Sequence, residues 1–317
     1  MIQTDWVIKR LRQQWSNLEI AIEQIRTTGD RVTNLPLTRI GGDGVFVTEI
    51  EFALRERRID LAVHSLKDLP TAQPEGLQVV VTGPREDVRD VLVSNVPFQI
   101  NENGLQPVGT DASSETYLRI GTCSLRRTAQ IRELCPDAEI LPLRGNVDTR
   151  LRKLEAGDYD GILLASAGLH RMELQERLSG RLTYLPVETM MPAPGQGALG
   201  LEIREEPELQ KLLAPLADPI VQATTSAERM FMRHLGAGCY LPVAAYGEVV
   251  DGILSLRGLV TSLDGQRCIR VCQRMIWTSA CTITDAEQLG VSLAEQALDR
   301  GAFEIIQAVN VARLQER

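Results

Sequence analysis

The stretch Ile59-Asp-Leu-Ala-Val-His-Ser-Leu-Lys-Asp-Leu-Pro70 decides the fold of this chain. Its first half, 59–64, is nearly continuously apolar, which is typical of a strand in a sheet covered on both faces. The strand ends abruptly in Ser65, Lys67 and Asp68. Because open α/β sheets bind ligands at the carboxyl ends of their strands, the stretch predicts an α/β domain with a ligand site at this end. A solvated strand end with a surface Lys–Asp pair fits it equally well.

The residues before and after this strand continue the α/β pattern. Apolar spacing predicts helices at 5–15 and 47–57 and strands at 18–25, 77–82 and 91–94. A glycine-rich loop at 40–46 precedes the second helix. Residues 95–116 are rich in Asn, Pro, Gly, Ser and Thr, which indicates a linker or a surface insertion.

A second α/β pattern follows this linker. It predicts strands at 117–121, 139–143, 160–165 and 198–203, and helices at 125–134 and 147–156. Thr122-Cys-Ser124 can cap the first of these helices, because small hydroxyl side chains accept hydrogen bonds from free backbone N–H groups. The alternation of strand and helix favours parallel sheets.

The last hundred residues have a different pattern. A predicted helix at 220–235 ends at a glycine-flanked loop, and three strands at 242–250, 253–261 and 267–276 are joined by Asp-Gly turns. A helix at 285–299 then closes the chain, with Gly301 as its stop signal. This part of the sequence predicts a small α+β domain with a three-stranded antiparallel sheet.

Length, charge and composition exclude several classes of protein. The 317 residues suit two or three domains, and the scarcity of aromatics (4%) and the net charge of −8 argue against a nucleic-acid partner. We expect no membrane partner and a cytoplasmic location, since the sequence has neither a long apolar run nor a signal peptide pattern. The six cysteines are too few for a disulfide framework, and Cys268 and Cys272 lack further zinc ligands, so no metal is expected.

Two arginines begin the helix that follows Gly121-Thr-Cys-Ser124. Arg126 and Arg127 lie in its first turn and therefore oppose the helix dipole, which costs stability unless an anion or an acidic side chain lies there. Free N–H groups at the same helix start also favour an anion. The alternative is that both arginines lie along the helix surface with their heads in solvent.

More arginines follow at strand-to-helix junctions, in Arg144-Gly-Asn-Val-Asp-Thr-Arg150 and at Arg171. Residues 119–153 carry eight Lys or Arg against four Asp or Glu, whereas the whole chain has an excess of eight acids. A basic patch on an acidic protein indicates a specific polyanionic ligand. Arginine pairs with both oxygens of a carboxylate, and the phosphate alternative lacks a Walker or dinucleotide-binding motif.

The loop Gly236-Ala-Gly-Cys-Tyr-Leu-Pro242 presents a lone cysteine between the second and third parts of the chain. Glycines allow unusual backbone dihedrals, so Cys239 is a candidate attachment site or nucleophile. A small buried loop cysteine is the alternative. His64, His170 and His234 form no Cys–His–Asp arrangement in the sequence and are interpreted as structural.

Together these motifs resemble those of the porphobilinogen deaminase (hydroxymethylbilane synthase) family over almost the full chain, in order and in spacing. The matching pieces are Ala62–Pro70, Gly121–Arg127, Leu143–Asn146 with Thr149–Leu151, Gly157–Asp160, Ala165–Leu169, Gly195–Ala198 and Gly238-Cys239. The resemblance implies an α/β fold with two lobes like those of type II periplasmic binding proteins and a small C-terminal α+β domain. The implied ranges are 1–94 with 195–217 for the first lobe, 107–191 for the second and 218–317 for the C-terminal domain.

The resemblance also implies a transferase of porphyrin, haem and tetrapyrrole biosynthesis that works as a monomer. Four porphobilinogen molecules would be condensed with loss of ammonia onto a dipyrromethane cofactor joined to Cys239 by a thioether, and hydrolysis would release the linear tetrapyrrole. Loss of ammonia leaves a cationic azafulvene, which the carboxylate of Asp68, the catalytic residue, would stabilise. The other implied cofactor ligands are Ser65, Lys67, Thr122, Ser124, Arg126 and Arg127, with Asp68 again among them. The implied substrate ligands are Arg126, Arg144, Arg150 and Arg171.

The sequence departs from the family pattern at three places. The family normally begins with a strand of the type Ile-Arg-Ile-Gly-Thr-Arg-x-Ser, whereas this chain starts inside the helix that follows. Arg39 and Asp43 stand at two common lysine positions of the glycine-rich loop, and 95–116 is longer than usual. These departures leave a second interpretation open, in which a truncated or degenerate relative binds pyrroles or other small anions without turnover.

Overall fold

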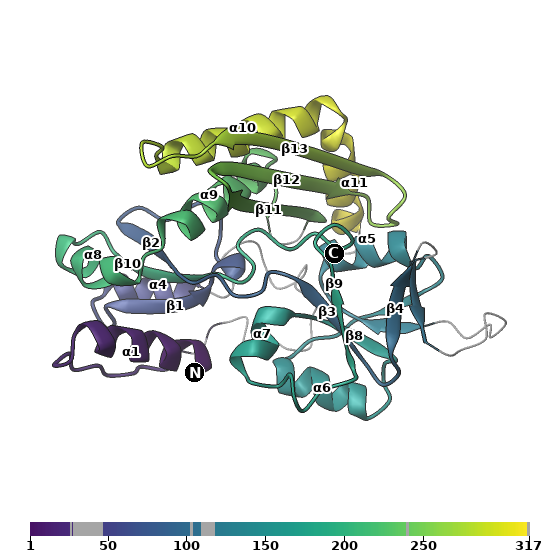
Figure 1. Cartoon of the computed structure of the whole chain (residues 1–317), viewed down its shortest axis with the longest axis horizontal. Coiled ribbons are helices and arrows are strands. Elements are labelled where there is room, and N and C mark those ends of the chain that lie inside the picture. Colours follow the sequence, from purple (N-terminus) through teal and green to yellow (C-terminus); the bar gives the residue numbers. More distant parts are fainter. Residues whose placement is uncertain (26, 28–46, 102–103, 109–117, 239–240, 316–317) are drawn as a thin grey trace.

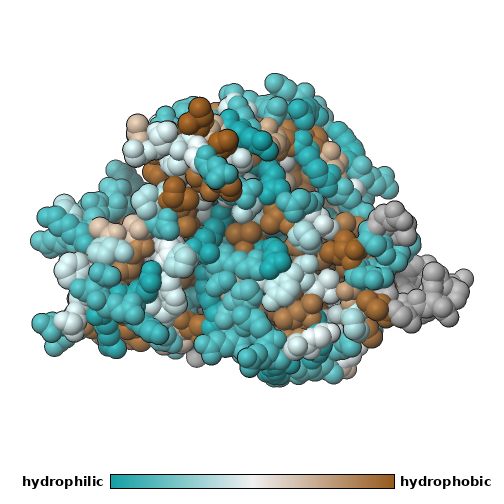
Figure 2. Space-filling view, in the orientation of Figure 1, coloured by the Kyte–Doolittle hydropathy of each residue, from teal (hydrophilic) through white to brown (hydrophobic). Residues whose placement is uncertain are grey.

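The structure, a computed structural model, describes residues 1–25, 27, 47–101, 104–108, 118–238 and 241–315. In this part of the chain, two lobes lie side by side and a third unit lies across both (Figure 1). Hydrophilic residues fill the seam between the two lobes on the face seen in Figure 2.

The first lobe is built on a sheet with the strand order β1-β10-β2, in which β10 runs antiparallel to both neighbours. Its elements are α1 (Ile2–Gln14), α4 (Thr48–Arg55), β1 (Leu61–Ser65), the 3-10 turn η1 (Leu66–Asp68), β2 (Leu77–Thr82), β10 (Leu199–Arg204), α8 (Pro207–Leu213) and the 3-10 turn η2 (Ala214–Leu216). Both faces of β1 are covered, because Ala62 packs with Leu54 of α4 while Val63 packs in the cluster around Leu201. The expected burial of this strand is therefore confirmed.

The strand expected at 18–25 is wrong, since these residues have no regular structure. Leu18 and Ile20 do pack against the cluster that contains Val7 and Leu11 of α1. Alternating apolar residues thus supply a buried face, but a strand also needs a neighbouring strand to pair with its backbone.

The second lobe contains a five-stranded sheet with the order β7-β6-β8-β3-β9. Its elements are β3 (Asp90–Ser94), β4 (Phe98–Asn101), β5 (Gly104–Pro107), β6 (Arg119–Gly121), α5 (Leu125–Leu134), β7 (Glu139–Leu141), α6 (Val147–Glu155), β8 (Gly161–Ala165), α7 (Ser166–Arg171) and β9 (Leu182–Leu185). The predicted parallel pairing is confirmed for β6 with β7 and with β8. In contrast, β3 runs antiparallel between β8 and β9, so the sheet is mixed.

Two expectations about the junction of the lobes are corrected. Strand β3 pairs with β8 and β9 of the second lobe, so the first lobe does not extend to residue 94. The reason is that all five residues of β3 are buried, which requires neighbours on both sides of the strand. Residues 95–116 are more than a linker, because they include the hairpin β4–β5. Phe98 and Leu105 of this hairpin are buried with Ile120, and the surrounding turn-forming residues conceal these short strands in the sequence.

The third unit combines a three-stranded antiparallel sheet, in the order β11-β12-β13, with helices. Its elements are α9 (Pro219–His234), β11 (Val243–Val250), β12 (Ile253–Thr261), β13 (Cys268–Ile276), α10 (Ile283–Asp299) and α11 (Ala302–Gln315). Phe231 of α9, Leu256 of β12 and Leu293 of α10 are fully buried together. The expectation that the helix at 285–299 closes the chain is wrong, because Gly301 at φ +93° turns the chain into α11.

The expected α/β fold class is confirmed: two α/β lobes are followed by an α+β unit with a three-stranded antiparallel sheet. The chain passes between the lobes twice, at residues 83–89, here called the first crossover, and at residues 186–198, the second crossover. Among the described residues, no helix combines the length and apolar character needed to cross a membrane.

Candidate active site

The turn after β1 carries three of the predicted site residues. Ser65 ends the strand, and its Oγ accepts a hydrogen bond of 2.8 Å from Nε2 of Gln3 in α1. Lys67 and Asp68 follow in η1, where Asp68 is exposed. Burial lowers the pKa of Lys67 to about 8, because an ammonium group loses hydration there.

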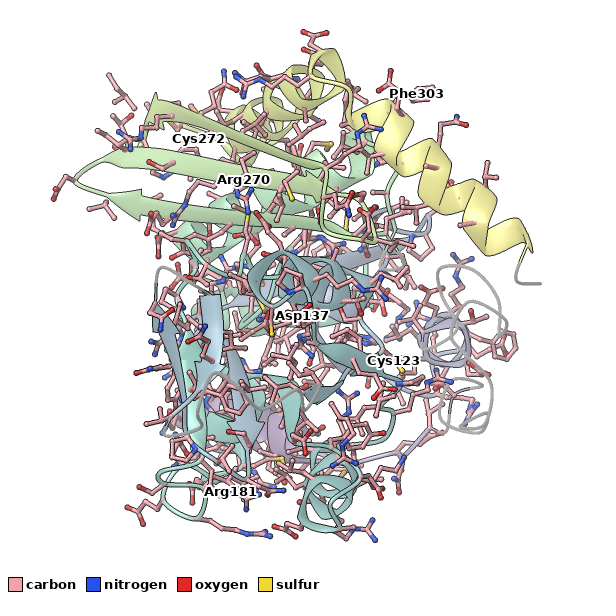
Figure 3. The ribbon with its side chains drawn as sticks, turned by 90° about the vertical axis from the view of Figure 1, so that its right-hand side faces the viewer. Cys123, Asp137, Arg181, Arg270, Cys272 and Phe303 are labelled. Carbon is pink, nitrogen blue, oxygen red and sulfur yellow. The ribbon has the colours of Figure 1, made fainter. Side chains whose placement is uncertain are left out.

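The junction between β6 and α5 brings three more residues to the same region. Thr122 is buried, and its Oγ1 accepts a hydrogen bond from the backbone N–H of Ser124. Ser124 is the N-cap of α5, as expected, and its Oγ accepts from the backbone N–H of Arg127. Cys123, between them, is exposed (Figure 3).

The side chains of Arg126 and Arg127 converge on a single buried carboxylate. Nη1 of Arg126 lies 2.6 Å from Oδ2 of Asp90, and Nη2 of Arg127 lies 2.7 Å from Oδ1. Although burial alone would raise the pKa of Asp90, the two guanidinium groups hold it well below the usual range of a carboxyl. The acidic partner that these arginines require is therefore Asp90, and the interpretation that both heads lie in solvent is wrong.

Both guanidinium groups also donate to main-chain carbonyls. Nη1 of Arg126 donates to Met191 O at 2.8 Å, and Nη1 of Arg127 donates to Leu163 O at 3.0 Å. Thus Arg126 joins α5 to the second crossover, and Arg127 joins α5 to β8. Because of these contacts, both side chains are held in place before any ligand binds.

The remaining predicted arginines have different surroundings. Nε of Arg150 donates to Gly145 O at 2.8 Å, and its pKa is lowered first by burial and then by the nearby charge of Arg127. Nη2 of Arg171 donates to Gly197 O at 2.6 Å, so this side chain lies against the second crossover. Arg144 is half-buried and lies close enough to Arg150 to lower its pKa as well.

The two lobes therefore bring opposite charges to one place. The charge of Asp68, on the first lobe, raises the pKa of Arg150 on the second lobe. In the same way, the charge of Asp90, on the second lobe, raises the pKa of Lys67 on the first. These electrostatic contacts join five cations to two carboxylates: Lys67, Arg126, Arg127, Arg144 and Arg150, with Asp68 and Asp90. The excess of positive charge favours a ligand with several negative groups.

Three predicted positions lie outside the described residues: Cys239, and the two departures from the lysine pattern at Arg39 and Asp43. Sequence reasoning also missed three residues that the structure brings to the site, namely Gln3, Asp90 and Gln196. The one available signal was for Gln196, a polar residue between two glycines in a motif that was noticed only for its order.

Two α/β lobes that bring an excess of positive charge to one place define, as a class, a protein suited to a polyanionic small molecule. Residues 1–211 match the sequence model described as "Porphobilinogen deaminase, dipyromethane cofactor binding domain", and residues 223–299 match "Porphobilinogen deaminase, C-terminal domain". The chain belongs to the porphobilinogen deaminase family.

Curated relatives agree with this assignment. The porphobilinogen deaminase of Syntrophobacter fumaroxidans is 43% identical, over 93% of this chain and 89% of the relative. That of Syntrophus aciditrophicus is 44% identical, over 95% and 92%. Among solved structures, an ancestral arginine-binding protein bound to arginine has a TM-score of 0.36 at 13% identity, over 68% of this chain and 80% of that one.

Family membership confirms four expectations from the sequence. These are the family itself, the transferase class, hydroxymethylbilane synthase as the function, and a dipyrromethane cofactor.

Proposed function

We propose that η1, the arginines of α5 and α6, and Arg144 in the turn before α6 form the active site at which this hydroxymethylbilane synthase joins porphobilinogen units. The observation that carries this proposal is the approach of Asp68, on the first lobe, to Arg150 on the second. Catalysis between two lobes requires such a meeting of a reactive carboxylate with substrate-binding cations. Of the described residues, the first lobe supplies the carboxylate of Asp68 and the second lobe supplies the arginines.

The side chains around the site fit a dipyrromethane bearing acetate and propionate groups. Arg127 and Arg144 both lower the pKa of Arg150, because the three positive charges lie close together. Anionic groups of a ligand would reduce the repulsion between them. Guanidinium groups pair with carboxylates through two parallel hydrogen bonds. When bound, the cofactor supplies the terminal pyrrole to which the first substrate unit is joined. The residues that would hold the cofactor are Lys67, Ser65, Thr122, Ser124, Arg126, Arg127 and Asp68. Cys239 would be its covalent attachment point.

Asp68 is the proposed catalytic residue. It is exposed at the end of β1, and its carboxylate is therefore accessible to a substrate. Loss of ammonia from porphobilinogen creates positive charge on the pyrrole, which a nearby carboxylate stabilises more in the transition state than in the ground state. The same carboxylate can exchange protons with pyrrole nitrogens.

Arg126, Arg144, Arg150 and Arg171 would bind the substrate carboxylates. A guanidinium group has five N–H donors, and within the described chain the side-chain hydrogen bonds of Arg126 all come from Nη1. Its remaining donors can therefore take a ligand carboxylate without breaking the contact with Asp90. Arg171 donates to Gly197 O through Nη2, so binding there would couple the substrate to the second crossover.

We also propose that the protein acts as a monomer in the cytoplasm, without nucleic-acid or membrane partners. The first lobe would comprise residues before the first crossover together with 199–217, the second lobe 90–185, and the third unit 218–317. The distribution of the strands over separate sheets supports these limits. Gel filtration with light scattering tests the monomer.

The proposal is tested with Asp68→Asn. This variant should retain two pyrrole units on Cys239, seen as added mass of the intact protein and as colour with an aldehyde reagent, but should lose most turnover of porphobilinogen. Near-normal turnover would remove Asp68 from the mechanism. If the unsubstituted protein, purified from a haem-producing host, carries no added mass, the alternative of a binder without turnover replaces the enzyme.

A further inference from the structure

Gln196 lies in the second crossover and is almost fully buried, with 1% of its surface exposed. Its backbone N–H donates to Ala193 O at 2.9 Å, and its backbone carbonyl accepts from Nε of Arg85, in the first crossover, at 3.0 Å. The residue thus joins the two crossovers through its main chain alone. Its side chain has three further partners.

The orientation of the side-chain amide follows from those partners. Nε2 donates to Val88 O at 2.7 Å and to Oδ1 of Asp90 at 3.0 Å. A carbonyl and an ionised carboxylate only accept, so the NH₂ group must lie on this side. Oε1 therefore faces Nζ of Lys67, at 3.3 Å.

We propose that Gln196 is a positioning residue of the reaction, which holds the ammonium group of Lys67 at the substrate site and connects it across the lobes to Asp90 and its two arginines. This inference rests on the proposed role of Lys67 in binding the cofactor. It adds a residue that touches neither cofactor nor substrate and acts through Lys67.

A glutamine suits this position better than its charged or apolar counterparts. A glutamate would place a second carboxylate about 3 Å from Asp90, where two like charges repel. A methionine would leave both Lys67 and Asp90 with one partner fewer in a buried place. The flanking glycines allow the close approach: Gly197 has a φ of +88°, and a Cβ there would lie 2.3 Å from Glu86 O.

The charge state of Lys67 gives a direct readout of this contact. The pKa of Lys67 is raised by the charges of Asp68, on its own turn, and of Asp90 in β3. It is lowered by the charges of Arg126 and Arg127 in α5. Removing the acceptor Oε1 destabilises the ammonium form, so the pKa of Lys67 must fall further below its usual range. A loss of packing alone would not move the titration of one lysine.

The experiment follows the ¹³Cε signals of labelled lysine by NMR in the cofactor-loaded protein between pH 6 and pH 11. The chain has four lysines, Lys9, Lys67, Lys153 and Lys211, so the signals are few, and Lys67→Arg identifies the one that belongs to Lys67. In Gln196→Met, we expect the midpoint of Lys67 to fall by about one pH unit. Turnover at pH 7.5 should fall about tenfold, as expected for losing a hydrogen bond to a charged group.

Gln130→Met is the matched control. Gln130 is also 1% exposed, and its amide binds the backbone of Met191 in the same crossover without touching Lys67. Its loss should lower stability and leave the Lys67 midpoint in place. If Gln196→Met does not fold, Gln196→Glu replaces it, with an expected upward shift of the midpoint.

Three outcomes decide the question. A midpoint that moves in the Gln196 variant and not in Gln130→Met supports the inference. An unmoved midpoint in the Gln196 variant overturns it, even if turnover falls. If Lys67→Met keeps normal turnover and cofactor content, the proposed role of Lys67 fails instead, and the inference about Gln196 fails with it.

Discussion

At the scale of single residues, the site depends on carboxylates that were not evident as partners in the sequence. Asp90 accepts from Arg126, Arg127 and Gln196, and it is fully buried. A charge removed from water is tolerated only when such hydrogen bonds replace its hydration. The arrangement therefore fixes two arginines of the second lobe in the orientation in which their other donors can meet a ligand.

We predict that Asp90→Asn costs about 3–5 kcal/mol of stability, because it leaves two buried guanidinium groups without their counter-charge. Urea unfolding followed by circular dichroism measures this loss. Asp137→Asn, at an exposed position after α5, is the control and should change stability by less than about 0.5 kcal/mol. Equal losses in the two variants would show that the Asp90 pairs contribute nothing.

The carboxylate of Asp90 also determines the direction in which the free energy of unfolding changes with pH. The folded pKa of Asp90 lies below its unfolded value, so its contribution is fully present above the unfolded pKa of about 3.9. It is lost as pH falls through the lower, folded pKa. The stability difference between Asp90→Asn and the unsubstituted protein should therefore persist from pH 7 to pH 5 and shrink only in stronger acid.

Sequence reasoning placed several of the proposed site residues at the ends of strands but did not predict their contacts. Ser65, Lys67, Thr122 and Ser124 were predictable because each follows a strand, and the end of a strand is a local signal. The partners of Arg126 and Arg127 were not, because Asp90 lies 36 and 37 residues away and meets them only after β3 enters the second sheet. Gln196 and Asp90 are 106 residues apart, and their contact depends on both crossovers.

At the scale of elements, the turn between β12 and β13 attaches the third unit to helix α5. Nη1 of Arg132 in α5 donates to Leu263 O at 2.7 Å. Arg270 of β13 lies where the sheet approaches α5 (Figure 3), and its Nη2 donates to both carboxylate oxygens of Glu133 at 2.7 Å. Gly265, in the turn, has a φ of +74°. Helix α5 begins with the site arginines, so this contact joins the third unit to the site.

We predict that Gly265→Ala is more damaging than the equivalent change in the other Asp-Gly turn of this sheet. A Cβ at Gly265 would lie 2.7 Å from Ala129 O, whereas at Gly252, with a φ of +72°, the nearest atom is Trp277 O at 3.6 Å. Both variants have the strain of a left-handed backbone, roughly 1 kcal/mol or more. Only Gly265→Ala also disturbs the contact with α5. Thermal unfolding of the two variants should differ by several degrees, and equal melting temperatures would contradict the docking.

Strands and helices were predicted best where the sequence has both a regular spacing of apolar residues and residues that mark the ends of the element. The bounds of α5 and β12 agree with the prediction because a capping Ser124 and two Asp-Gly turns mark the ends. Residues 18–25 have the period of a strand but no strand partner among the described residues. The placement of β3 was not predicted, because it depends on which sheet the chain enters after the first crossover.

At the scale of the whole molecule, one buried carboxylate joins the third unit to both crossovers. Glu228 of α9 accepts from Nη1 and Nη2 of Arg85 at 2.7 and 2.9 Å, from Gly195 N at 2.7 Å, and from Gly247 N at 2.7 Å. Arg85 belongs to the first crossover and Gly195 to the second. Any change in the angle between the lobes must therefore involve these contacts or turn about them.

We predict that Glu228→Gln destabilises the protein by about 3–5 kcal/mol, because Arg85 would keep a buried charge without its carboxylate. The new NH₂ group would also face a donor, either Arg85 or a backbone N–H, and one hydrogen bond would be lost. Glu248→Gln is the control: Glu248 is more than a third exposed, lies 3.4 Å from Arg257, and should cost less than about 1 kcal/mol. Hydrogen exchange adds a local readout, since the amides of Gly195 and Gly247 should exchange faster in Glu228→Gln and not in the control. If both amides keep their protection while stability falls, Glu228 stabilises α9 alone, and the crossovers are held by other contacts such as that of Arg171 with Gly197 O.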